Sequence, residues 1–353
     1  MTILITGGAG FFGSHLLPLL LTTCDEPLVC LDNFNDTYSP ERKWANLAPF
    51  ENHARVSIFA GDIRDVPLLK HIFARHQITQ VIHLAAHAGV RRSVEEPLEY
   101  ADNNVNGTTA LLEQCRRQPL ARVVIASSST VYGKQATVPF REDAPLGTPA
   151  SPYGATKRAT ELLAQTYHEL HGVPTVCLRP FSAIGPRLRP DLGMSIFART
   201  MLAGQPLPLL GDGSIRRDFT HVHDICQGIV SALTAENVIG ECINLGHDEP
   251  WTIRELISLL ETELGCRAKI KHLPPNAADL PATCADLTKA RRLLGYEPRI
   301  DLKQAVREFA VWFRQEGVFT AALPPAHVTE VLPFPTARTT PLPSPAAAQR
   351  RAA

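Results

Sequence analysis

The sequence has no excess of charge of either sign, no long apolar run and no closely spaced pair of cysteines. Its 35 basic residues equal its 35 acidic residues. Tight binding to a nucleic-acid backbone or an anionic membrane needs clustered Lys and Arg, so neither partner is expected. The longest apolar candidate, Leu16–Leu21, is interrupted by Pro18 and is much shorter than the ~18 residues of a membrane-spanning helix.

The eight cysteines are scattered and contain no Cys-x-x-Cys pair. This pattern favours reduced thiols in a cytoplasmic protein over a disulfide framework or a structural metal. The N-terminal segment Met1–Gly8 has no basic leader, which is not typical of a secretion signal. The pairs His83 with His87 and His221 with His223 lack a third ligand, so no metal site is predicted.

The first half of the chain alternates short β-branched runs with longer helical patterns. Strands are predicted at Ile3–Ile5, Val29–Asp32, Val56–Gly61, Gln80–Leu84 and Arg122–Ser127, and helices at Phe11–Leu21, Val66–His76, Leu98–Arg117 and Pro152–His171. This alternation is typical of a parallel sheet covered by helices on both faces. From Phe181 on, the strands are shorter, and helices are predicted at Met194–Ala203, Ile225–Thr234, Ile253–Leu264, Leu287–Leu294 and Leu302–Glu316.

Three glycines spaced three apart, Gly7, Gly10 and Gly13, follow the first predicted strand and open an apolar helix. Such a turn brings backbone amides and a helix N-terminus against a pyrophosphate. Asp32 ends the second strand, where a carboxylate accepts the ribose hydroxyls and repels a 2′-phosphate, which favours NAD over NADP. We therefore predict an α/β fold with a Rossmann-type doubly wound parallel sheet. The alternative for the three glycines is a tight structural turn that binds no dinucleotide.

Asp62 lies directly after the third predicted strand, in the stretch Gly61–Ile63. A carboxylate there can accept from the adenine amino group of a dinucleotide. The alternative is an ordinary aspartate of a turn at a strand end.

Tyr153 and Lys157 lie one helical turn apart, and a hydroxyl-rich turn, Ser127–Gly133, follows the fifth predicted strand. A neighbouring ammonium lowers the pKa of a phenol and makes it a usable base near neutral pH. A serine beside it can shuttle a proton or hold a sugar hydroxyl. The alternative for the serines is an ordinary turn at the end of a strand.

Together these motifs resemble the extended short-chain dehydrogenase/reductase family, and within it the nucleotide-sugar epimerases. The resemblance runs from Thr2 to about Phe313. The matching stretches are Thr6–Gly13, Asp32–Asp36, Gly61–Ile63, His83–Ala86, Asp102–Gly107, Ser127–Gly133, Tyr153–Lys157 and Arg217–Asp224.

The resemblance completes the predicted site. The expected NAD contacts are Gly7, Gly10, Phe11, Phe12, Gly13, Asp32, Asn33, Asp62, Ile63, Leu84, Ala85, Ala86, Asn103, Tyr153, Lys157 and Phe181. The expected catalytic residues are Tyr153, Lys157 and Ser128, and the expected substrate contacts are Arg91, Ser128, Ser129, Thr130, Ser182, Arg189 and Arg217, the last on the diphosphate.

The resemblance also indicates a domain organisation. Residues 1–180 are expected to form the NAD-binding domain, completed by about 219–246. Residues 181–218 and 247–320 are expected to form a smaller α/β lobe that binds the nucleotide sugar. Residues 323–353 contain seven prolines and little periodic apolar signal, which predicts a disordered tail.

Three stretches resemble UDP-glucuronate 4-epimerases more than UDP-glucose 4-epimerases: Asp32–Pro40, Ala88–Ser93 and Phe181–Asp191. The last places Ser182 where glucose epimerases usually have asparagine. Arg91 and Arg189 are the cations expected to bind a sugar carboxylate, since guanidinium offers a two-pronged fork. The alternative for each is a solvated surface arginine. Pro180 and Arg187–Leu188 depart from the family pattern and leave the shape of the sugar pocket open.

The family mechanism implies that Tyr153, kept deprotonated by Lys157, takes the proton of the sugar 4-hydroxyl while NAD receives hydride from C4 and later returns it. Dehydration is disfavoured because the serine turn contains no acid. A UDP-glucose 4-epimerase, another nucleotide-sugar dehydrogenase or dehydratase, and a non-catalytic NAD-binding regulator are the alternatives. The resemblance further implies a homodimer built from the helices Leu98–Arg117 and Pro152–His171.

Overall fold

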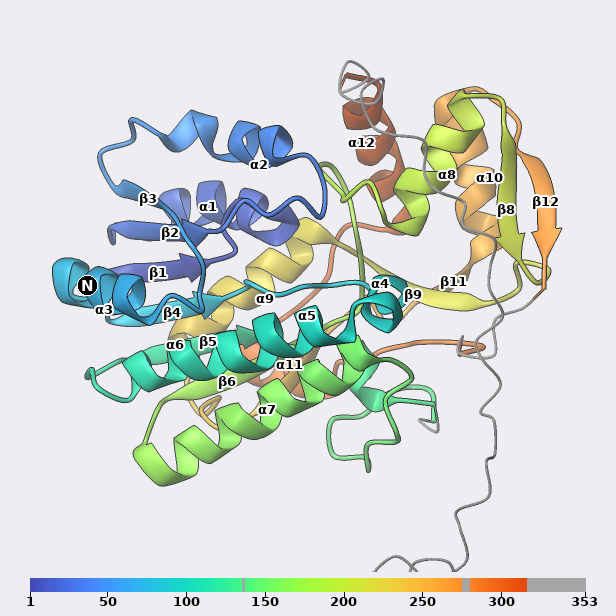
Figure 1. Cartoon of the computed structure of the whole chain (residues 1–353). Helices are drawn as coiled ribbons and strands as arrows, with labels where there is room; N and C mark the ends of the chain where they lie inside the picture. The colour runs from blue at the N-terminus through green and yellow to red at the C-terminus, as the bar shows by residue number, and fades with distance from the viewer. Residues whose placement is uncertain (135–136, 275–279, 316–353) are drawn as a thin grey trace, which may run out of the picture.

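The computed structural model describes residues 1–134, 137–274 and 280–315. Its centre is a seven-stranded sheet with the strand order β10-β6-β5-β4-β1-β2-β3, in which every neighbouring pair is parallel (Figure 1). The strands are β1 (Ile3–Thr6), β2 (Leu28–Asp32), β3 (Val56–Ala60), β4 (Gln80–His83), β5 (Arg122–Ala126), β6 (Thr175–Pro180) and β10 (Cys242–Leu245). The predicted Rossmann-type parallel sheet is confirmed.

Helices cover both faces of this sheet, which explains why its central strands are apolar throughout. Every residue of β1, β2, β5 and β6 is buried. One face packs against α1 (Phe11–Thr23) and α9 (Val222–Thr234), and the other against α3 (Val66–His76), α6 (Gly107–Cys115) and α7 (Pro152–His171). The sheet therefore separates two apolar clusters and holds its strand ends in a fixed frame.

The predicted helix Leu98–Arg117 is interrupted in the structure. It consists of α5 (Pro97–Ala101), a π-helical turn η2 (Asp102–Asn106) and α6. A π turn inserts one extra residue into a helix and is frequent at functional sites. This turn carries Asn103, one of the predicted cofactor contacts. The limits predicted for α3, α7 and α10 (Ile253–Leu264) agree with the structure.

Two smaller sheets and several helices lie beyond the strand ends of the main sheet (Figure 1). Strands β11 (Pro250–Thr252), β9 (Arg216–His221) and β7 (Ser182–Ile184) form one, and β12 (Lys269–Leu273) and β8 (Pro206–Leu210) the other. The remaining elements are α2 (Pro40–Leu47), η1 (Ala48–Phe50), α4 (Val90–Glu95), η3 (Ser129–Tyr132), α8 (Gly193–Leu202), α11 (Thr288–Leu294) and α12 (Leu302–Gln315). The predicted tail, residues 323–353, lies outside the described residues.

The eight cysteines are all free thiols. Within the three described ranges, no helix combines the length and the apolar character needed to cross a membrane.

Helix α12 anchors the end of the described chain in the apolar core, and its two faces differ sharply. Phe309 is 0% exposed, whereas Val311 on the same helix is 53% exposed. We expect Phe309→Ala to lower the free energy of unfolding by roughly 3–5 kcal/mol, because it leaves a cavity against α10 and β9. Val311→Ala should change it by less than about 0.5 kcal/mol. Urea unfolding of both variants checks this, and equal effects would contradict the assigned packing of α12.

Candidate active site

A cavity of about 700 Å³, its open mouth included, lies at the carboxyl ends of β1 and β4. The chain runs from β1 outward to β2 and from β4 outward to β5, in opposite directions along the sheet. Such a switch point leaves a crevice in which α/β sheets bind their ligands. The predicted residues that line it are Gly7, Gly10, Asp32, Asn33, Ile63, Leu84, Ala85, Ala86, Asn103 and Arg189.

The glycine turn holds β1, α1 and the loop after β4 closer together than any side chain permits. Gly7 has a positive φ of +74°, and a Cβ there would lie 2.6 Å from the Ala85 amide nitrogen. A Cβ on Gly13 would lie 2.4 Å from the Gly8 Cα. Gly10 is the N-cap residue of α1, and no capping side chain bonds to the backbone amides of the first turn. These amides are available to an anion in the cavity, so the turn fits a pyrophosphate.

Asp32, at the end of β2, is held rigidly at the rim of the same cavity. Its two carboxylate oxygens accept hydrogen bonds from the Ala9 amide at 3.1 Å and the Phe34 amide at 2.9 Å. Burial raises the pKa of this carboxyl above its usual value. Each oxygen keeps a second lone pair for a ribose hydroxyl, so the site fits the adenosine end of a dinucleotide.

The predicted adenine contact, Asp62, is already engaged by its neighbours. Its carboxylate accepts from the Asn33 amide at 2.9 Å and pairs with Arg64 at 2.8 Å. Burial works against ionisation, but the hydrogen bonds from Arg64 and Asn33 lower the pKa of Asp62 to about 2. The cavity is lined by its neighbours Gly61 and Ile63, and its contact with adenine stays a prediction.

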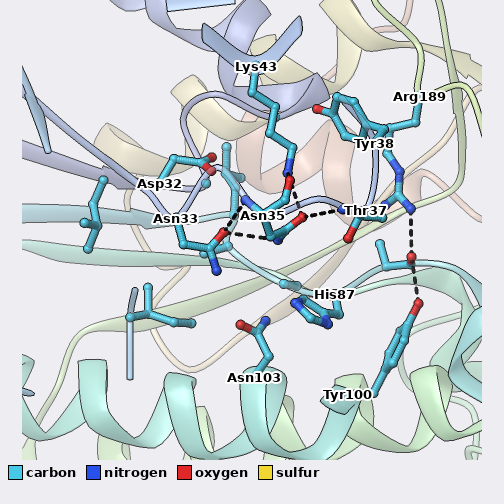
Figure 2. A pocket seen from close by; sticks show the side chains of 18 of the residues that line it. Asp32, Asn33, Asn35, Thr37, Tyr38, Lys43, His87, Tyr100, Asn103 and Arg189 are labelled. Carbon is cyan, nitrogen blue, oxygen red and sulfur yellow. Dashed lines mark hydrogen bonds between the residues drawn. The ribbon is translucent and has the colours of Figure 1, made fainter. Parts of the chain in front are cut away.

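Lys43 lines the cavity near Asp32, and sequence reasoning did not select it (Figure 2). Its ammonium donates to the Asn35 backbone oxygen at 2.6 Å and to the Asn35 side-chain oxygen at 2.7 Å, and lies 4.7 Å from the centre of the Tyr38 ring. Burial lowers the pKa of Lys43 to about 8. The available signal was the adjacent pair Arg42–Lys43, but the pair alone does not tell which cation faces inward.

Arg91 does not line the cavity, whereas its neighbour Arg92 does, and the predicted substrate contact of Arg91 stays a prediction. Both lie on α4, where consecutive side chains point about 100° apart. Arg91 is exposed, whereas Arg92 lines the cavity and pairs with Glu96 at 2.6 Å. Only the orientation of α4 decides between two adjacent arginines.

Arg189 reaches the cavity from the loop after β7. Its guanidinium forms a fork on the Asp191 carboxylate, at 3.0 and 2.6 Å, and donates to the Ala88 oxygen at 2.9 Å. The Tyr100 hydroxyl donates to the same oxygen at 3.0 Å (Figure 2). The fork shows that Arg189 has room to bind a carboxylate in two-pronged geometry.

The predicted catalytic residues meet beside this cavity. Ser128 ends the extended chain after β5, and its hydroxyl oxygen accepts from the Thr130 amide at 3.2 Å and from the Thr130 hydroxyl at 3.0 Å. Tyr153 lies in the first turn of α7, close enough to Ser128 for this hydroxyl to oppose the burial that raises the pKa of the phenol. Its ring contacts edge-on the ring of Tyr100, which lines the cavity, with the centres 6.2 Å apart.

Lys157 is bonded to the backbone at the end of β5, and its expected effect on the pKa of Tyr153 stays a prediction. The Lys157 ammonium donates to the Ala126 backbone oxygen at 2.8 Å, and burial lowers the pKa of Lys157 to about 8. Burial also raises the pKa of Tyr153, opposed by the nearby Ser128 hydroxyl and the charge of Arg189. Added positive charge beside the phenol would lower its pKa.

Other predicted contacts lie outside the cavity lining. Phe11, on α1, is buried in the apolar core, and the Phe12 ring stacks on it. Phe181 is also buried in this core, beside Tyr132 and Phe140. Ser129 lies in η3, Ser182 opens β7, and Arg217 donates to the Leu280 oxygen at 2.8 Å. Their roles, like those of Thr130 and Gly13, stay predictions. No cluster of metal-ligating side chains occurs among the residues that the structure describes.

The sequence profile of the family described as GDP-mannose 4,6 dehydratase matches residues 4–309. The chain belongs to this family of extended short-chain dehydrogenases/reductases. A UDP-glucuronate 4-epimerase from Thermodesulfobacterium geofontis is 37% identical over 313 residues, which cover 88% of this chain and 96% of that protein. UDP-glucuronate 4-epimerase 3 from Arabidopsis thaliana is 40% identical, covering 88% of this chain and 76% of that protein.

Solved structures agree with this family assignment. UDP-glucuronic acid 4-epimerase from Bacillus cereus, in complex with UDP-glucuronic acid and NAD, is 36% identical, with a TM-score of 0.84, 89% of this chain and 99% of that chain covered. A dTDP-glucose 4,6-dehydratase from Streptomyces venezuelae is 32% identical, with a TM-score of 0.83, 90% of this chain and 98% of that chain covered. The fold is shared by epimerases and dehydratases, so the site must distinguish them.

The lowered pKa of Lys157 makes the stability of the cofactor-free protein depend on pH. Below about pH 8 the ammonium is charged in the folded and the unfolded chain, and its burial penalty is constant. Between about 8 and the ordinary value of 10.5 only the unfolded chain keeps the proton, so the stability should rise by about 3 kcal/mol. Lys157→Met should lack this rise. Denaturant unfolding of both proteins from pH 7 to 10.5 tests it, and parallel curves would refute it.

Proposed function

We propose that this chain is an NAD-dependent 4-epimerase of UDP-glucuronate, which interconverts it with UDP-galacturonate. The observation that carries this conclusion is the meeting of Ser128 and Tyr153 beside a cavity in which Asp32 and the glycine turn fit NAD. The similarity to UDP-glucuronate 4-epimerases over nearly nine-tenths of the chain supports the substrate. NAD, when bound, accepts a hydride from C4 of the sugar and returns it, so the reaction has no net redox change.

The chain's own residues prepare the proton transfer that accompanies epimerisation. Tyr153, with Ser128 beside it, is the group that removes the proton of the sugar 4-hydroxyl and returns it. Lys157 holds the end of β5 through the Ala126 oxygen, one helical turn from Tyr153, and is the group we assign to lowering the pKa of this phenol during turnover. Thr130 keeps the Ser128 hydroxyl in place. We infer that Ser129, Ser182 and Arg217 contact the UDP-sugar, the last at its diphosphate.

We assign the sugar carboxylate to Arg189. Its fork on Asp191 occupies the geometry that a uronate carboxylate needs, and the Asp191 side chain is 37% exposed, so it can turn toward water when substrate binds. A uronate oxidised at C4 is a β-keto acid, which loses CO₂ easily. Two prongs from Arg189 hold the carboxylate in one plane and oppose this loss.

The arrangement of acids argues against dehydration, although the family's name includes it. Eliminating water needs a carboxyl group beside the reacting hydroxyls. The Glu161 carboxylate accepts from Ser127 at 2.6 Å and is held by Arg179. Its side chain is only 2% exposed, so it is not available to a sugar hydroxyl.

Two organisational proposals accompany the activity. Residues 1–180, completed by about 219–246, form the proposed NAD-binding domain. Residues 181–218 and 247–320 form the proposed lobe that binds the UDP-sugar. The cytoplasm is the proposed compartment, because eight free thiols, several of them partly accessible, persist in a reducing environment.

The activity is tested with purified protein, UDP-glucuronate and no added cofactor. The anomeric proton NMR signal of UDP-galacturonate should appear without growth of NADH absorbance. Tyr153→Phe should lower the rate by roughly 10²–10⁴-fold, since it removes the proton acceptor. Tyr167→Phe, on the same helix but bonded to Glu113 away from the cavity, should keep full activity. Turnover of UDP-glucose alone, net NADH formation, or an active Tyr153→Phe would each refute the proposal.

We also propose a homodimer in which α5 and α7 pack against the same helices of a second copy. Leu98 on α5 is 83% exposed, and Leu162 and Leu170 on α7 are 50% and 71% exposed. The two α7 leucines lie two turns apart on one side of the helix, and α5 packs beside α7. Such an apolar strip is typical of an interface between subunits.

A charge in this strip should dissociate the dimer. We expect the protein to sediment as a dimer and Leu170→Glu to sediment as a monomer, because the glutamate is desolvated in the interface. Val311→Glu, at a comparably exposed position of α12, should leave the dimer intact. A monomeric parent protein, or a dimeric Leu170→Glu, would contradict the proposed interface.

A further inference from the structure

Three turns of α7 contact three consecutive residues at the end of β5. Lys157 donates to the Ala126 oxygen at 2.8 Å, Glu161 accepts from the Ser127 hydroxyl at 2.6 Å, and Tyr153 lies near Ser128, whose hydroxyl opposes the rise of the phenol pKa. The three α7 residues are spaced four apart, which places them on one face of the helix. The first two belong to the proposed catalytic set, but the third has no assigned role.

Glu161 is itself fixed by a buried ion pair. Arg179 on β6 donates to both Glu161 carboxylate oxygens, at 2.8 and 2.9 Å, and the two side chains are 3% and 2% exposed. The guanidinium lies 4.8 Å from the centre of the Tyr132 ring, and the Tyr132 hydroxyl donates to the Asn244 side chain at 2.7 Å. Glu161 therefore connects the end of β5 to β6, η3 and β10.

A buried ion pair is a poor means of adding stability, because desolvation of both charges offsets their attraction. A different benefit follows from its contact with Ser127. A carboxylate is a pure acceptor, so the single hydroxyl proton of Ser127 is committed to Glu161. The two adjacent serines therefore have separate partners on α7: Ser127 is bonded to Glu161, and Ser128 is left beside Tyr153.

We propose that Glu161, held by Arg179, is a positioning residue that orients Ser128 against Tyr153 by anchoring the Ser127 hydroxyl. This inference rests on the proposed epimerase function and extends it beyond the groups that touch the sugar. Without the anchor, Ser127 is free to donate toward the sugar side, and the turn that carries Ser128 loses its fixed direction. The proton transfer at Tyr153 then slows, while the cavity that binds NAD is unchanged.

Ser127→Ala tests the proposal most cleanly, because it removes one hydrogen bond and leaves the Glu161–Arg179 pair intact. In the holoenzyme with UDP-glucuronate, we expect kcat to fall about tenfold, the effect of one hydrogen bond to a charged group. KM and the bound NAD should stay at their parent values. The matched control is Arg158→Gln, which removes an exposed arginine 3.4 Å from the same carboxylate and should leave kcat unchanged.

The pH profile separates positioning from a general loss of stability. The groups that face Tyr153 are Lys157 on its own helix, Ser128 after β5, the Tyr100 ring on α5 and the charge of Arg189. Ser128 opposes the raised pKa of Tyr153, so loosening it should move the acid limb of kcat to higher pH in Ser127→Ala. A variant that is only less stable shows a lower melting temperature with an unmoved limb.

The outcomes are distinct. A parent-like kcat and acid limb in Ser127→Ala, or a loss confined to melting temperature or to KM, overturns the positioning role. An equal loss of kcat in Arg158→Gln also overturns it, since Arg158 contacts Oε2 of Glu161 and Ser127 donates to Oε1. If the parent protein itself does not convert UDP-glucuronate, the proposed function fails instead, and this result is seen before any variant is compared.

Discussion

The close approach of the Gly7 turn to the loop after β4 is the constraint on which the site depends. A Cβ at Gly7 would lie 2.6 Å from the Ala85 nitrogen, so the two chain segments touch through backbone alone. This contact sets the width of the crevice between β1 and β4 and directs the start of α1 into it. Asp32, Asn103 and Arg189 then reach one cavity from three different parts of the chain. The strand order creates the cavity. The glycines let the backbone approach a dinucleotide bound in it.

The cations that line the site are bonded to groups of the protein itself. Arg189 is paired with Asp191, Arg92 with Glu96, and Lys43 is bonded to Asn35. The chain has no net charge, yet the stretch from Arg179 to Arg217 contains six arginines and two aspartates. An anionic substrate therefore meets cations whose present partners are short, partly exposed side chains of the same loops and helices. Exchange of an internal carboxylate for a ligand's carboxylate needs little reorganisation of the backbone, which suits a site that binds a diphosphate and a uronate.

Much of the fold and the cofactor half of the site could be predicted because their signals are local. The parallel sheet follows from buried β-branched runs separated by amphipathic helices, and the limits of α3, α7 and α10 follow from apolar periodicity and capping residues. Gly7, Gly10 and Asp32 are recognisable because backbone approach and ribose binding need those residue types at those positions. The places of Arg92 and Lys43 in the cavity lining could not be predicted, because the rotation of α4 and α2 about their axes is set by packing against the rest of the protein.

The sequence by itself determined the fold class, the dinucleotide crevice and the set of groups available for proton transfer, since each rests on residues close together in the chain. Only the tertiary structure decided how those groups are used. It placed Lys157 on the Ala126 oxygen and buried Tyr153, and this burial raises the pKa of the phenol. It also joined Ser127, Glu161 and Arg179, which lie on three separate elements, into one buried contact. The physical reason is that pKa values and buried pairs depend on distance and solvent exclusion in space, which spacing along the chain does not record.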